Sequence, residues 1–288
     1  REMKLDSRSM ARFAARGFIR LDGIVPAALN ERFMSEAGVI EPPATTASEA
    51  GPAPLRLSEL MASSDLPEVK PGTAVRDAYE RGTALGDIIR LPAVSGAIES
   101  LVGRGAIVDH HFLHVAFPPS FYAASGLAQR SQHTHQDSTI DPRTAFDIQL
   151  FYFPHEVTEA MGGTRFIPGT HLRIVSEAAI ARYQNIVGQE HVVCSAGTVL
   201  VMHHGIWHGG GINMTETPRY MFKIRLQPTE PQHRLWDTSD LTAADFEQRP
   251  IFFRKTPADP NDIAAILVRP EPWFEADTGR IEYINRIR

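Results

Sequence analysis

Cysteine is nearly absent from this chain, which carries a single one, Cys194. Internal disulfides are therefore excluded, and a reducing compartment such as the cytoplasm is the expected location. Long apolar runs are lacking too: no stretch approaches the ~18 residues that span a bilayer, so we predict no membrane partner. Positive charge is not in excess either, since the net charge is −5 and no basic stripe follows the sequence. This balance predicts no nucleic-acid partner.

Apolar residues are plentiful: they make up 43% of the 288 positions. This length and composition suit one substantial core, or two small domains at most. The apolar pattern predicts helices at 8–16, 26–37 and 76–103, the last one interrupted at Pro92. Strand-like runs punctuated by glycine and proline occupy 18–21, 107–117, 146–153, 165–167, 191–193, 197–203 and 220–226. Many short strands with this punctuation favour a jelly roll or a barrel.

Two other regions have a weaker pattern. Residues 41–56 are rich in Pro, Ala, Thr, Ser and Gly and have no apolar period. They predict a loop or a flap rather than a linker between domains, because too little core precedes them. Helix-like pieces at 241–248 and 262–267 are separated by prolines.

His135 and Asp137 are the first candidates for chemistry. On a strand, residues i and i+2 face the same side, so both side chains can enter one cavity. His208 follows a later strand-like run and directly precedes three glycines. Two imidazoles and one carboxylate can hold one face of an iron(II) ion and leave three positions open. By itself the His-x-Asp pair is weak evidence, because the chain has 12 histidines.

Arg219 strengthens this interpretation. It follows His208 by eleven residues and begins the next strand, so an antiparallel pairing would bring it back beside that histidine. Its guanidinium offers a carboxylate a planar fork of donors. The combination predicts an oxygenase that binds iron, 2-oxoglutarate and O2 together. The alternative for Arg219 is a surface arginine at a strand start. A surface or core position is the default for four other histidines: His110, His114, His155 and His191.

The chain also resembles a known family. The stretches that carry the resemblance are His135-Gln136-Asp137, the run GGTRFIPGTH at 162–171, and the run from His208 to Arg219. In order and spacing they are similar to the phytanoyl-CoA dioxygenase branch of the iron(II)/2-oxoglutarate oxygenases. The resemblance covers roughly residues 105–228.

This resemblance implies a mainly β fold with flanking helices. The fold is the double-stranded β-helix, a cupin-like jelly roll. We expect a single oxygenase domain over residues 1–288, with its jelly-roll core at about 105–228. The N-terminal helical region 1–104 and the C-terminal extension 229–288 are expected to pack on that core.

The resemblance also assigns roles to individual residues. It implies His135, Asp137 and His208 as the iron ligands, and Arg219 as the partner of the distal carboxylate of 2-oxoglutarate. Further contacts to this co-substrate are implied for four residues on strands: Gln149, Phe151, Leu113 and His111. Ordinary filling of the barrel is the alternative for these four. Gly210 departs from several relatives, which carry a serine there that contacts the co-substrate.

The implied cofactors are Fe(II), 2-oxoglutarate and O2. The implied reaction is hydroxylation of an unactivated C–H bond in a small metabolite or natural-product intermediate, with release of succinate and CO2. Asp137 bears on this outcome, because halogenating relatives replace the carboxylate with a small residue so that chloride can bind iron. Desaturation or ring formation by the same oxidant stays open.

Two alternative functions also stay open. One is hydroxylation of a fatty acyl-CoA, for which the phosphates of coenzyme A would require a basic mouth. Arg165, Lys223 and Arg225 are available for that purpose, although the sequence shows no cluster. The other is a cupin-like metal-binding jelly roll without oxygenase activity, against which Arg219 and its spacing argue. The sequence does not predict the oligomeric state.

Overall fold

The computed structural model describes residues 3–38, 47–48, 51–52, 65–126, 128–137, 145–173, 175–182, 185–233 and 235–242. Its strands are β1 (Phe18–Leu21), β2 (Ala47–Ser48), β3 (Gly51–Pro52), β4 (Thr73–Ala74), β5 (Ile107–Ala116), β6 (Ile148–Phe153), β7 (Arg165–Phe166), β8 (Glu190–His191), β9 (Thr198–His203), β10 (His208–Gly209) and β11 (Arg219–Gln227). The main sheet has six strands in the order β1-β9-β6-β11-β5-β4. A smaller sheet has the order β10-β7-β8, and β2 pairs with β3.

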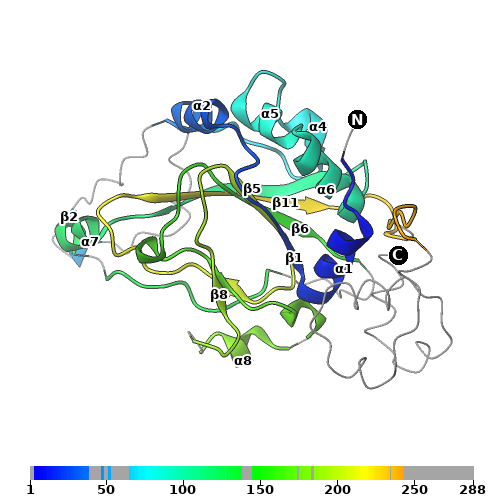
Figure 1. Ribbon diagram of the computed structural model, residues 1–288. Coiled ribbons are helices and arrows are strands. Elements are labelled where there is room, and N and C mark those ends of the chain that lie inside the picture. Colours follow the sequence, from blue (N-terminus) through cyan, green and yellow to red (C-terminus); the bar gives the residue numbers. More distant parts are fainter. Residues whose placement is uncertain are drawn as a thin grey trace.

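The described helices lie around the main sheet. They are α1 (Ser7–Arg16), α2 (Ala27–Ala37), α4 (Val75–Ala78), α5 (Ala84–Ile89), α6 (Pro92–Val102), α7 (Pro119–Ser125) and α8 (Glu177–Ile180), with 3-10 turns η1 (Glu159–Met161) and η2 (Thr170–Leu172). Figure 1 shows α2, α4, α5 and α6 along one side of the sheet, with β8 and α8 on the other. None of the described helices is long and apolar enough to cross a membrane.

Local chemistry sets the ends of these helices. The Asp6 side chain caps α1 by accepting a hydrogen bond from Ser9 N, and α1 ends at Gly17, whose φ of 80° is left-handed. Thr83 caps α5 in the same way, accepting from Gly86 N. Pro92 begins α6, because its ring presets a helical φ and its missing N–H is not needed there. The predicted helix over 76–103 is therefore three short helices.

The two faces of the main sheet bury different clusters. On the helix side, Phe33 of α2 lies edge-on to Tyr152 and Phe222, with ring centroids 5.0 and 5.6 Å away. On the other side, Phe151 and Phe166 belong to a second apolar cluster between the two sheets. All six residues of β6 are buried, because β6 is central in the sheet and covered on both faces. This arrangement is the predicted double-stranded β-helix with flanking helices.

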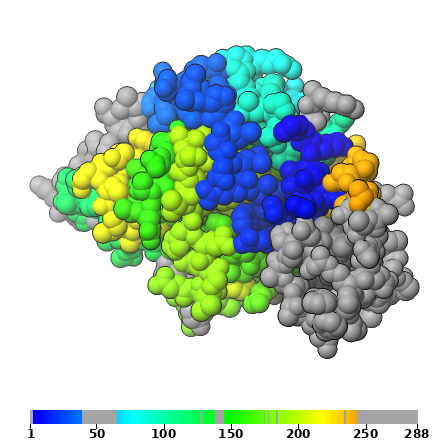
Figure 2. Space-filling view, viewed as in Figure 1, coloured from blue at the N-terminus to red at the C-terminus, as the bar shows by residue number. Residues whose placement is uncertain are grey.

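The N-terminal region contributes strands as well as helices. β1 pairs antiparallel with β9, with Phe18 opposite Met202, and β4 pairs with the start of β5. Figure 2 shows the blue N-terminal segment directly beside the yellow-green segment that includes β9. The predicted strand at 18–21 is confirmed, and the other predicted strands are present with small shifts in their ends. Most of 41–56, and all but the first two residues of the helix-like pieces at 241–248 and 262–267, lie outside the described residues.

Candidate metal centre

His208 and His135 lie opposite each other in the wall of the jelly roll. His208 belongs to β10, where it pairs with Phe166 of β7. It also forms an isolated antiparallel bridge with His135, held by two backbone hydrogen bonds of 2.9 Å. The two imidazole centroids are consequently 4.4 Å apart. The strand expected around His135 is reduced to this single bridge.

Asp137 brings the third ligand atom to the two imidazoles. Its Oδ1 lies 3.3 Å from Nε2 of His135, and its Oδ2 lies 3.6 Å from Nε2 of His208. The three ligand atoms all lie within 4.8 Å of one another. Among the described residues, no other group of three or more His, Cys, Asp or Glu side chains is arranged to hold a metal ion. The sequence prediction therefore selected three side chains that the fold does bring together.

A backbone carbonyl fixes the second nitrogen of each imidazole. Nδ1 of His135 lies 3.0 Å from the carbonyl oxygen of His133, and Nδ1 of His208 lies 2.9 Å from that of Ile206. A carbonyl can only accept, so each Nδ1 carries the proton and each Nε2 keeps its lone pair for a metal. Metal-binding histidines are usually oriented by a second hydrogen bond of this kind.

Burial and charge prepare the ligands for a cation. Burial lowers the pKa of His208 to about 4, so this imidazole is neutral at neutral pH. Burial also acts to raise the pKa of Asp137. The contacts of its oxygens with Nε2 of His135 and His208, together with the charge of Lys223, outweigh this effect and hold that pKa well below its usual range. Lys223 Nζ donates directly to Oδ2 of Asp137. Two imidazoles and an anionic carboxylate fit the ligand set of a non-haem iron(II) oxygenase.

Arg219 is buried without an anionic partner among the described residues. Its Nη1 donates to the carbonyl oxygen of Gly162, and its Nε is buried with no hydrogen-bond partner. Burial lowers the pKa of Arg219 to about 10, so the guanidinium remains charged at neutral pH. An unpaired buried charge is costly, which indicates that an anion belongs beside it.

Arg219 faces the same side of the main sheet as the three metal ligands. Alternate residues of β11 share one face, so Arg219 and Lys223 point the same way. Lys223 contacts Asp137, which places that face toward the metal ligands. The anion expected at Arg219 and the metal expected at the triad therefore belong to the same face of the main sheet. β10 and β11 lie in different sheets, so Arg219 arrives there from the main sheet and not through an antiparallel pairing with the strand of His208.

Gln149 and Phe151 lie on this same face, as predicted. In register, Gln149 is opposite Arg225 and Phe151 is opposite Lys223. The Phe151 ring centroid is 5.8 Å from that of His208. Oε1 of Gln149 is buried and has no hydrogen-bond partner, so it is free to accept from a ligand. Their roles toward 2-oxoglutarate remain predictions, now with a placement that suits them.

Leu113 and His111 do not lie where the sequence prediction required. Leu113 is opposite Phe222 and belongs to the cluster under the helices, with 2% of its surface exposed. His111 Nδ1 lies 2.7 Å from the hydroxyl oxygen of Tyr79, on the same helix-covered side. Because side chains alternate along a strand, a shift of one residue moves a side chain to the other face. This placement argues against a contact of these two residues with 2-oxoglutarate and favours the alternative of core packing.

His114 is the site residue that sequence reasoning missed. It lies opposite Met221 of β11, on the face that carries Arg219 and Lys223. Burial lowers its pKa to about 3, and the charge of Lys223 adds to this effect. Its Nε2 is buried without a hydrogen-bond partner. The family resemblance indicated the correct strand. An assignment shifted by one residue along that strand would have selected His114 in place of Leu113.

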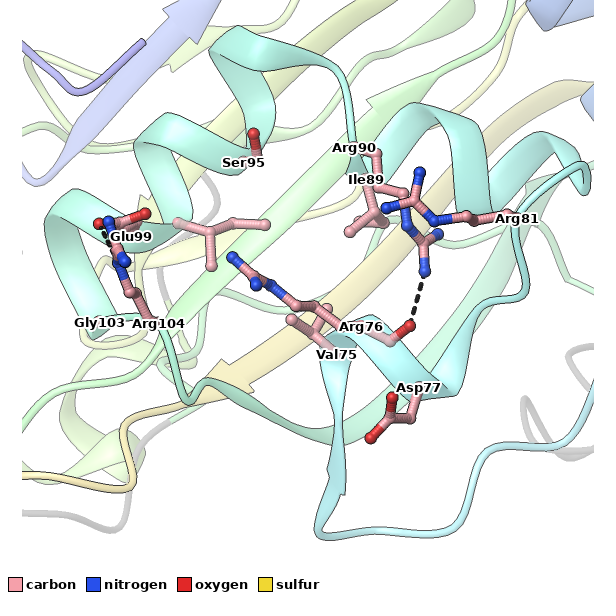
Figure 3. A pocket seen from close by; sticks show the side chains of 11 residues that line it. Val75, Arg76, Asp77, Arg81, Ile89, Arg90, Ser95, Glu99, Gly103 and Arg104 are labelled. Carbon is pink, nitrogen blue, oxygen red and sulfur yellow. Dashed lines mark hydrogen bonds and ion pairs between the residues drawn. The ribbon is translucent and has the colours of Figure 1, made fainter. Parts of the chain in front are cut away.

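A cavity of about 440 Å³ lies among α4, α5 and α6 (Figure 3). Arg76, Arg81, Arg90 and Arg104 surround it together with Asp77 and Glu99. Arg90 donates to the carbonyl oxygens of Arg76, Tyr79 and Gly86, and Arg104 donates to Glu99. Arg90 therefore joins the end of α5 to α4, while Arg104 binds back to α6. None of the lining residues belongs to the triad or faces it, because the helices cover the opposite side of the sheet.

The family model described as phytanoyl-CoA dioxygenase (PhyH) matches residues 13–221, well over half of the chain. The chain belongs to the phytanoyl-CoA dioxygenase family. It is therefore a non-haem oxygenase of the class that depends on iron and 2-oxoglutarate. The triad and the unpaired Arg219 fit these two cofactors. No curated protein matches the chain.

Solved structures of other proteins share this fold. ThoJ, a non-haem monooxygenase in its apo form, is 21% identical, with 96% of this chain and 98% of ThoJ covered and a TM-score of 0.51. HygX from Streptomyces hygroscopicus, with nickel and 2-oxoglutarate bound, is 11% identical over 78% of this chain and 88% of its own, with a TM-score of 0.53. The epimerase SnoN, in complex with Fe3+, alpha ketoglutarate and nogalamycin RO, is 17% identical over 88% and 91%, with a TM-score of 0.52. At such identities the likeness concerns the fold alone.

Proposed function

We propose that this member of the phytanoyl-CoA dioxygenase family hydroxylates an unactivated C–H bond of a small metabolite or natural-product intermediate, converting 2-oxoglutarate and O2 to succinate and CO2. The observation that carries the proposal is the pairing of the His135–Asp137–His208 triad with a buried Arg219 that lacks a described counter-ion. A metal-binding jelly roll without oxygenase activity would have no use for a buried cation beside its metal. Two of the similar structures, HygX and SnoN, hold 2-oxoglutarate or alpha ketoglutarate.

The protein's own side chains position the reactants. His135, Asp137 and His208 would hold iron on one face and leave three positions for other ligands. Arg219 would receive the distal carboxylate of 2-oxoglutarate in a charge-assisted pair. Gln149, Phe151 and His114 line the same wall, and the last of these offers a neutral imidazole nitrogen. When bound, the iron supplies the oxidising chemistry, while the buried wall excludes water.

Asp137 supports hydroxylation over halogenation. Its carboxylate lies within hydrogen-bond reach of both Lys223 and His135, so it is anionic and fixed in direction. A carboxylate at this position takes the place that a halide would need on the metal. Desaturation or ring closure starts from the same C–H abstraction and is an outcome that product analysis separates.

The contacts of three basic residues support a small substrate over a fatty acyl-CoA. Arg165 donates to the carbonyl oxygen of Gln132, Lys223 contacts Asp137, and Arg225 pairs with Asp147. Lys223 and Arg225 are thus paired with carboxylates, and Arg165 is buried inside the protein, so the three do not form an exposed basic mouth for the phosphates of coenzyme A. The partner we propose is a small molecule, and a reducing compartment such as the cytoplasm stays a prediction from the lone Cys194.

A screen for succinate release tests the proposal. Purified protein, loaded with Fe(II) under anaerobic conditions and supplied with 2-oxoglutarate, is exposed to O2 in the presence of a library of metabolites and natural-product intermediates. We expect at least one compound to stimulate succinate formation and to gain the mass of one oxygen atom. The same reactions in excess chloride should give no chlorinated product. Iron binding without 2-oxoglutarate turnover under any condition would favour the cupin-like metal-binding jelly roll. Turnover with acyl-CoA thioesters alone would favour hydroxylation of a fatty acyl-CoA.

A further inference from the structure

The backbone of Asp137 is held differently from that of the two histidines. His135 and His208 hold each other through a pair of backbone hydrogen bonds. Asp137 lies outside any described strand, and its N–H reaches the carbonyl oxygen of His204 at a longer 3.3 Å. Its own carbonyl oxygen accepts a hydrogen bond of 2.7 Å from Nη1 of Arg225. The Arg225 side chain thus supplies the hydrogen bond to the Asp137 backbone that a neighbouring strand would otherwise supply.

Arg225 is in turn fixed by a buried carboxylate. Its Nε and Nη2 lie 2.8 and 2.7 Å from Oδ2 of Asp147. The Asp147 side chain is only 2% exposed and that of Arg225 is 11% exposed. A guanidinium held through two nitrogens has little freedom left, so the direction of its Nη1 is set by Asp147.

The contacts close into a ring around the metal ligand. The backbone N–H of His204 donates to the carbonyl oxygen of Asp147 over 3.0 Å, and the N–H of Asp147 donates to Nδ1 of His204 over 2.7 Å. His204 then accepts from the N–H of Asp137. The ring runs from Asp137 to Arg225, to Asp147, to His204 and back to Asp137. It ties the segment that carries the carboxylate to the ends of β6 and β9.

We propose that the Arg225–Asp147 pair is a positioning element that fixes the backbone of Asp137, and with it the direction in which the carboxylate meets the iron. The inference rests on the proposed role of Asp137 as a metal ligand. It assigns Arg225 and Asp147 no contact with substrate or metal. Residues that orient a metal ligand in this indirect way typically change metal affinity about 10- to 100-fold when they are removed.

The test compares iron affinity in matched variants. Fe(II) is titrated anaerobically into the full-length protein with saturating 2-oxoglutarate, and the metal-to-ligand charge-transfer band is followed. For Arg225→Gln we expect iron affinity to fall about tenfold or more, with a shifted band, while 2-oxoglutarate affinity at saturating iron stays near the wild-type value. Arg225→Lys should lose less, because an ammonium keeps the charge but cannot span Asp147 and the Asp137 carbonyl as a planar fork does.

A double variant separates positioning from folding and from charge. Arg225→Gln leaves the Asp147 carboxylate buried without its partner, which can unfold the protein. Arg225→Met combined with Asp147→Leu removes both charges together, so the net charge near the metal is unchanged and the interior stays apolar. We expect this variant to fold and to show the same loss of iron affinity. Arg20→Gln, which breaks an exposed pair with Asp22, serves as the control and should bind iron normally.

Two failures are distinguishable. If the folded double variant and Arg225→Gln bind iron with wild-type affinity and an unshifted band, the positioning role is wrong even though the iron site stands. If the wild-type protein itself binds no Fe(II), or gives no band with 2-oxoglutarate, the proposed function fails first. A lowered melting temperature with unchanged iron affinity would assign the pair to stability alone.

Discussion

The two faces of β5 bury histidines in opposite ways. On the helix-covered face, His111 has its partner, the hydroxyl of Tyr79 at 2.7 Å. On the other face, three residues further along, Nε2 of His114 is buried with no partner. Buried polar groups in folded proteins are nearly always hydrogen-bonded, so an exception requires an explanation.

Three such exceptions lie on the face of the main sheet that carries Arg219 and Lys223. Nε of Arg219, Oε1 of Gln149 and Nε2 of His114 all lack partners and all belong to strands that meet beside His208. A bound ligand with carboxylate and carbonyl oxygens would satisfy the donors among them. We infer that the helix-covered face serves stability and the opposite face serves chemistry, and substitutions on each face test this division.

The largest effect is expected for His208→Ala. His208 supplies one of only three protein bonds to the metal, so its loss should abolish Fe(II) binding and turnover. The fold should survive, because His208 lies in a short strand away from the main apolar cluster. Metal content by plasma emission and circular dichroism check the two halves of this prediction. His233→Ala, at an exposed histidine, is the control. Full iron occupancy in His208→Ala would remove this residue from the site.

Arg219→Ala should impair 2-oxoglutarate binding and spare iron binding. Loss of a sheltered guanidinium–carboxylate pair costs about 2–5 kcal/mol. The apparent KM for 2-oxoglutarate should therefore rise by at least about an order of magnitude, since ~1.4 kcal/mol is tenfold. Arg219→Lys should recover part of the loss, because an ammonium cannot make the planar pair. An unchanged titration of the charge-transfer band with 2-oxoglutarate would mean that another base, such as Lys223, holds the carboxylate.

Leu113→Ala should lower stability and spare 2-oxoglutarate binding, the opposite of the effect expected for Arg219→Ala. Leu113 is buried in the apolar cluster under the helices, so truncation should lower the free energy of unfolding by about 2–5 kcal/mol. The KM for 2-oxoglutarate in the folded variant should not change. Urea unfolding and steady-state kinetics on one preparation give both quantities. A large rise in KM without loss of stability would return Leu113 to the co-substrate site.

The smallest effect is expected from the pH dependence of stability at His111. Burial lowers the pKa of His111 below its ordinary value of 6.5 in the folded protein, and the nearby His110 adds to this. As pH falls below 6.5, the unfolded chain takes up the proton first, so stability is lost toward acid and is fully present above 6.5. One such group contributes at most about 1.4 kcal/mol per pH unit.

His111→Gln removes this contribution. Chemical unfolding at a series of pH values from neutral to mildly acid should then give a shallower loss of stability than in the wild type. His110 and His114 also have lowered pKa values, so part of the slope should remain. A slope that is unchanged or steeper in the variant would show that His111 is already protonated, or already exposed, in the folded protein.

The sequence was sufficient for the parts of the site that depend on residue type and spacing. His135, Asp137, His208 and Arg219 follow from the chemistry that iron and a dicarboxylate require, and the fold brings all four to one side of the main sheet. The strand at 18–21 was predictable because it is short, apolar and closed by turn residues on both sides.

Other parts could not be read from the sequence for physical reasons. Residues 107–116 carry histidines and apolar residues on both faces of their strand. The alternation of side chains therefore does not indicate which face is buried under the helices. For this reason the sequence prediction selected Leu113, one residue before His114. Arg225 and Asp147 are 78 residues apart, and their ring with Asp137 exists only through tertiary contacts. Spacing along the chain carries no signal for such a contact.

Crystals grown anaerobically with Fe(II) and 2-oxoglutarate offer the most direct measurement. Anomalous diffraction at the iron edge, combined with electron density for the co-substrate, locates both cofactors at once. We predict one iron peak bound by Nε2 of His135, Nε2 of His208 and a carboxylate oxygen of Asp137, with the distal carboxylate of 2-oxoglutarate on Arg219. An iron peak away from these three residues, or a co-substrate carboxylate bound elsewhere, would contradict it.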